Sequence, residues 1–293
     1  MASPSETGNA RRPLNKPVVA RQSLLYIMLI VIALIYIFPF LIQIFTIFKT
    51  DSDTVAHPLS LLPTTWTAQA LKTLFFDTGN YDFPVWAMNS AIVTLFVTVG
   101  RVMFDSMAGY ALARLHYRGR NAVFAGLVAI MAVPNVVLMI PKFLVIRELG
   151  IFNTYPGMII PLLVDATGVF IMKGFFESIP VSIEEAARVD GASPFRTFWS
   201  VTLPMARSAL ITIIILSFQG SWNELEQFIV STNSPSLMTL TLGVASLNSG
   251  QLGATKHYPL QLAAATLMTI PVAVLFFIFQ KRIMNVGEGA VKE

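Results

Sequence analysis

Long apolar runs without charged side chains constrain this chain more than any other feature. Residues 23–48 and 258–280 contain no Asp, Glu, Lys or Arg. A continuous apolar stretch of about 18 residues or more is typical of a helix that crosses a lipid bilayer. The first run is longer than the apolar core of a signal peptide, which has about 7 to 15 residues, and no small-residue cleavage site follows it. It therefore predicts a helix that is retained in the membrane.

Composition supports a membrane protein and argues against several other classes. Only 12% of the 293 residues are charged, against about 25% in soluble domains. The chain has no cysteine for disulfide bonds or thiol catalysis, and His57, His116 and His257 are too scattered to predict a metal site. The net charge of +4 fits the cytoplasmic loops of a membrane protein better than a nucleic-acid partner. We expect an all-α polytopic protein surrounded by the lipid bilayer.

Six apolar stretches predict six transmembrane helices. Their approximate ranges are 23–48, 85–113, 121–141, 151–172, 205–222 and 258–280. Together they would form one membrane domain, residues 23–285, between a basic tail over residues 1–22 and a short tail over residues 286–293. Most of the 20 Lys and Arg residues lie in the two tails, in the loop 114–120 and in the segment 173–207. Because positively charged loops stay on the cytoplasmic side, we expect both termini and the segment 173–207 in the cytoplasm.

A mostly polar segment, residues 180–204, separates the fourth and fifth predicted spans. Ser182 with Glu185 three residues later has the spacing of a capping box, in which each side chain satisfies a backbone N–H of the first helical turn. Gly191 tolerates the left-handed conformation that ends many helices. These signals predict a short helix over residues 183–190.

A second helix start follows this turn directly. Ser193 followed by Pro194 is an N-cap with proline at the first helical position, so we expect a second short helix toward residues 203–204. In the first helix, Glu184 and Arg188 are spaced to form an i,i+4 pair. That helix also offers a small apolar patch, made of Ile183, Ala186 and Ala187. The patch fits docking to another protein, and a solvated connector whose alanines favour the helix is equally compatible.

Polar residues inside the predicted spans are candidates for a substrate path, because hydrocarbon penalises them. They are Asn89, Asn135, Asp165, Gln219, Trp222 and Asn223. Amides beside an aromatic face are typical of sugar sites, which points to the last three, near the end of the fifth span. The alternative, which the residues alone favour, is that the amides join helix to helix and Trp222 belongs to an interfacial aromatic belt. Arg101 and Asp105, spaced i,i+4 in the second span, are interpreted as a structural pair.

The segment 180–204 and several other motifs resemble one family of membrane proteins. Glu185-Ala186-Ala187, Gly191 and Val201-Thr-Leu203-Pro204 are spaced as in the EAA loop of binding-protein-dependent ABC importer permeases, with Val201 in place of the usual isoleucine. Further motifs are similar to the maltose-type carbohydrate branch of this family: Ala108-Gly-Tyr-Ala-Leu-Ala-Arg114, Ser221-Trp-Asn-Glu224 and Gly289-Ala-Val-Lys292. Glu224 and Glu226, where the family often has more apolar residues, depart from the pattern. The resemblance covers nearly the whole chain.

The resemblance implies a type I ABC importer permease fold with six spans. The loop 180–204 would be a coupling helix that seats in a cytoplasmic ATPase subunit, through Glu184, Glu185, Ala186, Ala187, Arg188, Asp190, Gly191, Leu203 and Pro204. The implied partners are a second homologous permease, two ATPase subunits and an extracytoplasmic solute-binding protein. The implied solute is a sugar or oligosaccharide, and the implied location is the cytoplasmic (inner) membrane of a bacterium or archaeon.

Nucleotide chemistry is expected on the partners rather than on this chain. The sequence contains no G-x-x-x-x-G-K-[ST] stretch, which is the loop that cradles nucleotide phosphates in P-loop proteins. ATP and Mg would therefore bind to the ATPase subunits, and we expect this chain to bind no cofactor or metal and to be no enzyme itself. Glu185 has two competing roles, capping its helix or contacting the ATPase, and capping is favoured.

Two other classes of function remain as alternatives. An ion-coupled secondary carrier or channel would move ions through Asp105 or Asp165, but no repeat symmetry is visible in the sequence. A membrane-embedded enzyme would need a catalytic constellation, and the sequence contains no paired His/Glu cluster and no evident nucleophile.

Overall fold

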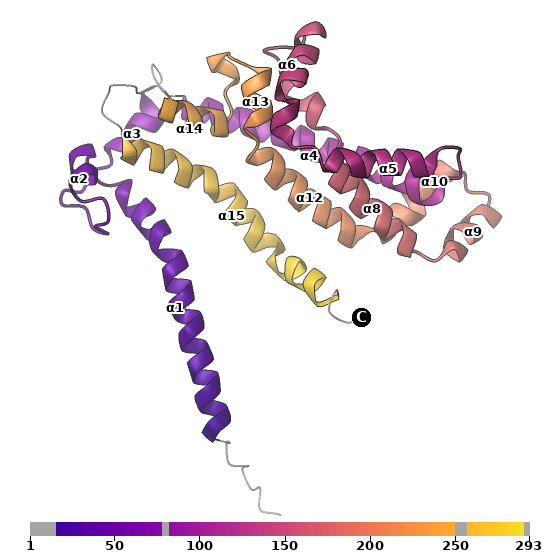
Figure 1. The fold of residues 1–293 in the computed structure, drawn as a ribbon, viewed down its shortest axis with the longest axis horizontal. Coiled ribbons are helices and arrows are strands. Elements are labelled where there is room, and N and C mark those ends of the chain that lie inside the picture. Colours follow the sequence, from indigo (N-terminus) through magenta and orange to yellow (C-terminus); the bar gives the residue numbers. More distant parts are fainter. Residues whose placement is uncertain (1–15, 78–81, 250–256, 290–293) are drawn as a thin grey trace, which may run out of the picture.

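The computed structural model describes residues 16–77, 82–249 and 257–289, with side chains described over residues 24–77, 82–247 and 257–280. Every regular element in these ranges is a helix. The helices form an elongated body, from which α1 (Lys16–Thr46) departs as an arm (Figure 1). The tail predicted over residues 1–22 lies outside the described residues up to residue 15 and is helical from Lys16 onward. Residues 290–293 of the predicted C-terminal tail also lie outside the described residues.

Within the described ranges, three helices are each long and apolar enough to cross a membrane. They are α1, α4 (Phe83–Arg114) and α15 (Tyr258–Gly289), and they cover the first, second and sixth predicted spans. Helix α4 is the centre of the body, because it packs along both α8 (Ala166–Ser178) and α12 (Arg207–Trp222). This central position places the polar residues of α4 between two neighbouring helices.

Three further helix pairs have the length and hydrophobicity of a span but are bent. Helix α5 (Arg120–Met131) and the stretch formed by η1 (Asn135–Leu138) and α6 (Met139–Glu148) differ in direction by 102°. Pro134 lies in this break, where it has no N–H to continue the hydrogen bonding of α5. Residues 121–141, predicted as one span, therefore hold α5 and, beyond the bend, η1 and the first residues of α6. The other bends are 41°, between α7–η2 (Tyr155–Ile159 and Ile160–Leu162) and α8, and 83°, directly before α12.

Short helices lie at the two ends of the body (Figure 1). One end carries α2 (Asp51–Ala56), α3 (Gln69–Phe76) and α14 (Leu240–Ser249). Beside α6 and α4 lie α13 (Glu226–Ser231) and η4 (Pro235–Leu237). The opposite end carries α9 (Val181–Val189) and α10 (Pro194–Thr197), followed by a π-helical turn, η3 (Phe198–Thr202), and by α11 (Leu203–Met205).

A compact aromatic cluster lies beneath α9 and α10. The ring of Tyr110 in α4 contacts those of Phe176 in α8 and Phe198 in η3, at centroid distances of 5.7 and 5.1 Å. Gly109 lets α4 and α8 approach this closely, because a Cβ at that position would lie 2.6 Å from Cβ of Met172. Each such aromatic pair contributes about 0.5–1.5 kcal/mol beyond its buried area. The segment 180–204 therefore rests on a rigid base.

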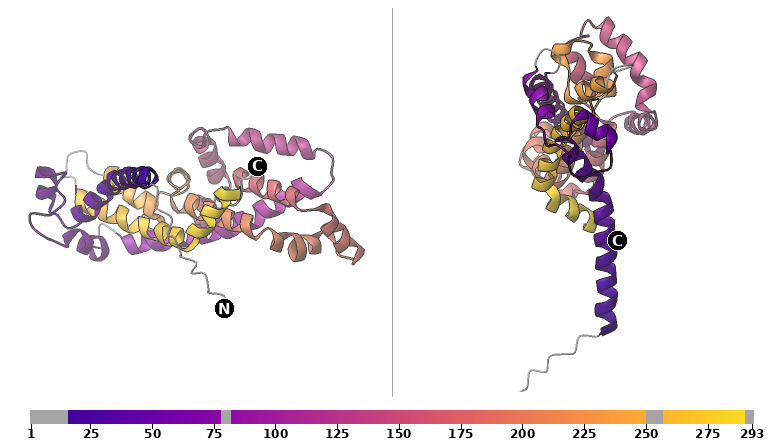
Figure 2. Two further views of the ribbon diagram at one scale, coloured as in Figure 1. Left: turned by 90° about the horizontal axis from the view of Figure 1, so that it is seen from below. Right: turned by 90° about the vertical axis from the view of Figure 1, so that its left-hand side faces the viewer.

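Helix α1 is exposed along almost its whole length (Figure 2). Its apolar window is 0% buried by the rest of the chain. It meets the body near its C-terminal end, where Nε2 of Gln43 donates a hydrogen bond of 2.9 Å to Oγ1 of Thr266 in α15. An apolar helix with this exposure needs lipid or another membrane helix around it.

Candidate functional site

Helix α9, the first helix of the segment 180–204, begins two residues earlier than predicted. Pro180 has φ −57° and ψ 133° and is the N-cap residue, and no side chain caps this helix. Ser182 and Glu185 lie inside the helix, so the predicted capping box is wrong. The physical reason is that Pro180 already has the extended conformation of an N-cap residue, so the first turn starts at Val181. The carboxylate of Glu185 is exposed and free of a capping role.

The predicted turn at Gly191 is confirmed. Gly191 has φ +77°, the left-handed region that other residues rarely adopt. The N–H of Ala192 donates to the carbonyl of Ala187 at 2.9 Å, and the N–H of Gly191 donates to that of Arg188 at 3.0 Å. These two bonds form a complete Schellman motif. The turn between the two short helices is thus fixed by backbone hydrogen bonds.

The second helix start is also confirmed. Oγ of Ser193 accepts a hydrogen bond of 3.3 Å from the N–H of Arg196, and Pro194 occupies the first turn. The helix then widens into the π-helical turn η3 before α11. The chain therefore reaches residues 203–204 as predicted, but as three short helical pieces.

A buried ion pair fastens α9 to the body. Nε of Arg114, the last residue of α4, lies 3.1 Å from Oε1 of Glu184, and the two side chains are 8% and 2% exposed. Nη2 of Arg114 also donates to the carbonyl of Phe176 at 2.5 Å and to that of Ile179. The predicted pair between Glu184 and Arg188 is present at 3.8 Å, with Arg188 largely exposed. One guanidinium therefore joins the ends of α4 and α8 to α9.

The apolar patch predicted on α9 is divided between two faces. Ala187 is buried, and Ile183 packs against the cluster around Phe176. Ala186 is exposed, as are Glu185, Arg188, Asp190 and Gly191 among the predicted coupling residues. Glu184 is buried, Leu203 is half-buried and Pro204 is exposed. Helical periodicity explains the division, because positions 183, 184 and 187 fall on the inner side of α9.

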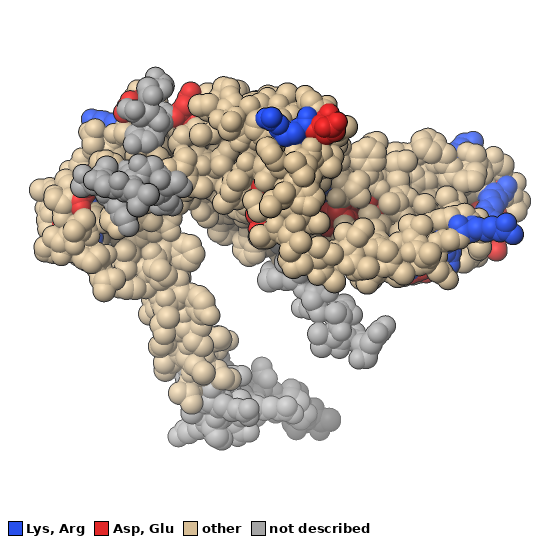
Figure 3. All heavy atoms as spheres, turned by 45° about the horizontal axis from the view of Figure 1, so that its top comes forward, with Lys and Arg blue, Asp and Glu red and all other residues tan. Residues whose placement is uncertain are grey.

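The outer face of this end carries apolar side chains that the sequence analysis missed. Val189 is 88% and Phe195 is 65% exposed, and Trp199 contacts Phe195 edge to face at 6.1 Å. The i,i+4 spacing of the two aromatic residues was the available signal. Lys and Arg side chains gather at the same end of the molecule (Figure 3). Exposed apolar groups within a basic surface are typical of a contact with another protein.

Two of the predicted substrate-path residues are used inside the fold. Nδ2 of Asn89 donates to the carbonyls of Ser236 and Met238 at 2.9 and 2.8 Å, and its Oδ1 accepts from the hydroxyl of Tyr155 at 2.6 Å. The Trp222 side chain is buried, and its Nε1 donates to the carbonyl of Met268 at 2.9 Å. Neither side chain is free for a solute, which agrees with the helix-joining alternative for Asn89. Trp222 is a core residue, and so it belongs to no interfacial belt.

The other amides of α12 lie on one exposed face. In the C-terminal half of this helix the exposed positions are Leu216, Gln219 and Gly220, and the exposed C-cap residue Asn223 follows them. Their spacing of i, i+3, i+4 and i+7 places them on one side. Nδ2 of Asn223 donates to the carbonyl of Gln219 at 2.9 Å. We call this side the polar face of α12. Asn135 is also exposed, but it lies apart from this face, at the break after α5.

A cavity of about 230 Å³ lies between α4, α8 and α12, beside the polar face. It is lined by Arg101, Asp105, Asp165, Thr167, Gly168, Ile213, Leu216, Ser217 and Gly220. The predicted side-chain pair of Arg101 with Asp105 is replaced by contacts to the next helix. Nε of Arg101 donates to the carbonyl of Leu162 at 2.7 Å and its Nη2 lies 3.9 Å from Oδ2 of Asp165. Asp105 accepts a hydrogen bond of 3.0 Å from the N–H of Asp165.

This cluster stabilises a break in the chain. Asp165 is the N-cap of α8, and its Oδ1 accepts from the N–H groups of Thr167 and Gly168 at 2.8 and 3.2 Å. Backbone groups that are not helical need such partners inside a membrane. The described residues include no group of three or more His, Asp or Glu side chains placed to hold a metal ion.

Glu224 and Glu226 have a local role. Oε1 of Glu224 accepts a hydrogen bond of 3.0 Å from the N–H of Gln227, in the first turn of α13. Glu226 lies in that same first turn, where a negative charge is favoured by the helix dipole. The two acidic residues therefore stabilise the start of a short helix.

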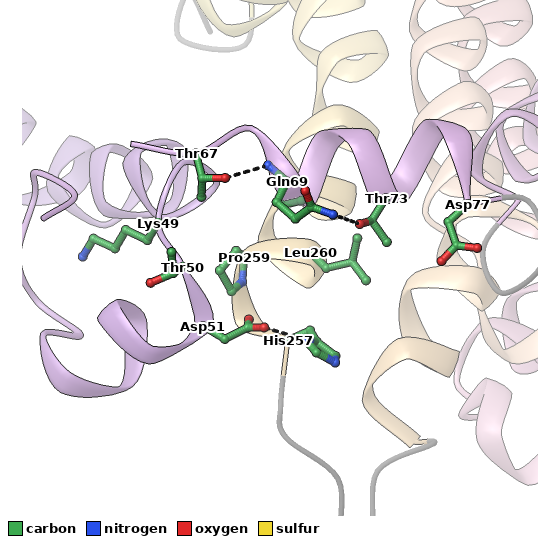
Figure 4. A pocket seen from close by; sticks show the side chains of 11 residues that line it. Lys49, Thr50, Asp51, Thr67, Gln69, Thr73, Asp77, His257, Pro259 and Leu260 are labelled. Carbon is green, nitrogen blue, oxygen red and sulfur yellow. Dashed lines mark hydrogen bonds and ion pairs between the residues drawn. The ribbon is translucent and has the colours of Figure 1, made fainter. Parts of the chain in front are cut away.

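A second cavity, of about 510 Å³, lies at the end of the body that carries α2 and α3 (Figure 4). Its wall includes Asp51, whose Oδ2 lies 2.6 Å from Nδ1 of His257. Gln69 donates hydrogen bonds to the hydroxyls of Thr67 and Thr73 along another wall. Nζ of Lys49 donates to the carbonyls of His57 and Ser60 at 3.0 and 2.5 Å. This pair of Asp51 and His257 joins the start of α2 to the start of α15.

Comparison with known proteins identifies a family that covers most of the chain. The chain matches the model of the family described as "Binding-protein-dependent transport system inner membrane component" over residues 105–284, which include α9, α10 and α12. Its relatives include the arabinooligosaccharides transport system permease protein AraQ of Halalkalibacterium halodurans, with 30% identity over 89% of this chain and 93% of the relative.

Two further relatives and one solved structure are similar over comparable lengths. The inner membrane ABC transporter permease protein YcjP of Escherichia coli is 30% identical over 88% of this chain and 92% of its own length. The sn-glycerol-3-phosphate transport system permease protein UgpE of Yersinia pestis is 29% identical over 87% and 92%. A crystal structure of a bacterial ABC transporter involved in the import of the acidic polysaccharide alginate has the same fold, with a TM-score of 0.76 and 24% identity over 92% of this chain and 99% of that chain. This chain belongs to the family of binding-protein-dependent transport system inner membrane components.

Proposed function

We propose that this chain is the membrane-spanning subunit of an ATP-driven importer, and that the segment 180–204 receives the movement of a partner ATPase. The observation that carries the proposal is the arrangement of α9. Its inner face is joined to α4 and α8 through Glu184 and Arg114, and its outer face exposes Glu185 and Ala186. A force applied to that outer face would be transmitted directly to the two central helices, because the joint is buried and charged.

The complex would contain a second homologous permease, two ATPase subunits and an extracytoplasmic solute-binding protein. ATP and Mg would bind to the ATPase subunits. The exposed arm α1 supports a second membrane subunit, because its apolar surface is left uncovered by this chain. The basic end around α9 and α10 would face the cytoplasm of a bacterium or archaeon, with both chain termini on that side of the inner membrane.

The solute would be a sugar or oligosaccharide that passes along the polar face of α12. A relative named for arabinooligosaccharides supports this solute class. Gln219 and Asn223 supply exposed amides on that face, and polar groups of this kind inside a membrane segment normally face protein or a water-filled cavity. Asn89 and Trp222 would act by packing the helices behind it.

Copurification tests the proposal, with a matched pair of glycine substitutions. Gly191 and Gly150 both have positive φ, +77° and +67°, and a Cβ at either position would meet no atom within 4 Å. Gly191→Arg and Gly150→Arg therefore introduce the same backbone strain, at a site inside and a site outside the segment 180–204. We expect an ATPase subunit to copurify with the native chain and with Gly150→Arg, and to be lost from Gly191→Arg. Isolation of the native chain as an active transporter without any ATPase would contradict the proposal.

A further inference from the structure

The cavity between α4, α8 and α12 is lined by a buried carboxylate whose second oxygen has no hydrogen-bond partner among the described residues. Asp105 is fully buried, and its Oδ1 accepts the N–H of Asp165. Its Oδ2 has no hydrogen-bond partner among the described residues. Gly168 makes room for this oxygen, because a Cβ there would lie 2.1 Å from Oδ2. A buried carboxylate oxygen without a partner costs free energy unless a ligand or water supplies a donor.

The charges around the cavity leave no excess of positive charge. Two carboxylates, from Asp105 and Asp165, line it together with one guanidinium, from Arg101. That guanidinium is held by two groups of the next helix, because its Nε donates to the carbonyl of Leu162 and its Nη2 lies 3.9 Å from Oδ2 of Asp165, which offsets its charge. Even with Asp105 protonated, the three groups would sum to zero. With both carboxylates ionised the sum is −1, so a carboxylate or phosphate of a solute would meet net like charge, whereas a hydroxyl or ammonium group would find an acceptor in the partly exposed carboxylate of Asp165.

The cavity opens on the side where a solute would pass. The Asp165 side chain is 38% exposed, and Thr167 and Gly220 at the rim are exposed as well. Gly220 belongs to the polar face of α12. Exposed charge at membrane depth normally faces protein or a water-filled space, because facing hydrocarbon is costly.

We propose that Arg101, Asp105 and Asp165 form a selectivity site of the transport path, which admits neutral or amino sugars and rejects sugars that carry carboxylate or phosphate groups. This inference rests on the proposed function, since it assumes that the polar face of α12 lines the path. One relative and one fold neighbour are named for the acidic solutes glycerol phosphate and alginate, and for this chain the inference predicts the opposite preference.

The natural absence of cysteine allows a direct test of charge preference. Thr167→Cys places a single thiol at the rim of the cavity, and Asn223→Cys places one on the same polar face but outside the cavity lining. Both variants would be purified as the complete transporter in nanodiscs. Each would react with a cationic trimethylammonium-ethyl and an anionic sulfonatoethyl methanethiosulfonate, and the ratio of the two rates measures local charge independently of the solute-binding protein.

We expect the ratio of cationic to anionic rates to be on the order of tenfold higher for Thr167→Cys than for Asn223→Cys. Adding Asp165→Asn should lower the ratio severalfold, and adding Arg101→Gln should raise it. Gly220→Cys is a second rim position that tests accessibility alone, because its Cβ would lie 3.4 Å from Nη1 of Arg101 and the guanidinium would lower its ratio. Equal ratios at rim and control positions, or a preference of the rim for the anionic reagent, would overturn the inference.

Accessibility is a separate result of the same experiment. If Asn223→Cys reacts and neither rim thiol does, the cavity is closed to water and the inference is wrong, while the path along α12 stands. If none of the three thiols reacts, the path along α12 fails as well. Loss of the ATPase from the native complex would instead count against the proposed function itself.

Discussion

The ion pair between Arg114 and Glu184 gives the sharpest prediction about stability. It lies at the joint between α4 and α9, with side chains 8% and 2% exposed and an N–O distance of 3.1 Å. Replacing one partner leaves the other charge buried, which costs about 3–5 kcal/mol in comparable sites. Arg188 gives little compensation, because its own contact with Glu184 is 3.8 Å long and 62% of its side chain is exposed.

The two single substitutions should destabilise the joint by different amounts. Glu184→Gln keeps the shape of the side chain and one acceptor, so we expect it to lower the local free energy of unfolding by about 3 kcal/mol. Arg114→Ala also removes the donor to the carbonyls of Phe176 and Ile179, and each buried acceptor left without a donor adds about 1–3 kcal/mol. In the double variant no buried charge is left alone. Its loss should therefore be smaller than the sum of the single losses by about 2 kcal/mol.

Hydrogen exchange measured by mass spectrometry detects this local loss of stability in the segment where it occurs. A local loss of about 3 kcal/mol speeds exchange of the segment 180–204 about a hundredfold. Glu185→Gln is the matched control, because Glu185 is the next residue of the same helix and is exposed. It should change local stability by less than about 0.5 kcal/mol. If Glu184→Gln speeds exchange no more than Glu185→Gln does, the joint is not stabilised as the structure implies.

Three further predictions concern other parts of the chain. Trp222→Phe should lower stability by about 2–3 kcal/mol, since it loses the indole hydrogen bond and part of the buried ring that packs in the core. Transport should persist, and abolished transport in a fully stable variant would restore Trp222 as a solute contact. Gly109→Ala should lower the thermal midpoint by several degrees, because its Cβ would lie 2.9 Å from a backbone nitrogen, whereas Gly174→Ala, which meets no atom within 4 Å, should not. The hydrogen bond from the N–H of Thr64 holds the pKa of Asp53 below its usual range. The stability that this hydrogen bond gives the folded state is therefore present at neutral pH. It is lost as the pH falls below about 4 and through the folded-state pKa. Asp53→Asn should flatten that part of the curve of thermal midpoint against pH, and an unchanged curve would contradict the assignment.

Local signals predicted the turn of the candidate site correctly. Gly191 and the Ser193-Pro194 pair act within one helical turn, so a few neighbouring residues decide the outcome. The capping role of Glu185 failed at the same scale, because Pro180 had already set where the helix begins. The break at Pro134 in the third predicted span could have been predicted from the sequence, since proline cannot continue the hydrogen bonds of α5.

Contacts between distant segments could not be predicted from the sequence. Arg114 and Glu184 are far apart along the chain, and nothing in their neighbours pairs them. Periodicity alone also does not tell which face of α12 is covered. For Trp222 the sequence left a solute contact and an interfacial belt as the two interpretations, and it named neither the core nor the partner in α15. Arg101 was assigned to Asp105, although the packing of α8 gives it Asp165.

Cross-linking from α9 tests the central claim most directly. Glu185→Cys would carry a benzophenone as the single thiol adduct of a cysteine-free chain. Leu59→Cys, at a residue that is 75% exposed near α2, at the opposite end of the body, is the control. We expect light to cross-link the Glu185→Cys variant to an ATPase subunit and to leave the Leu59→Cys variant without this cross-link. An ATPase that copurifies with both variants but is never joined to the Glu185→Cys variant would contradict the claim that the segment 180–204 is the coupling loop.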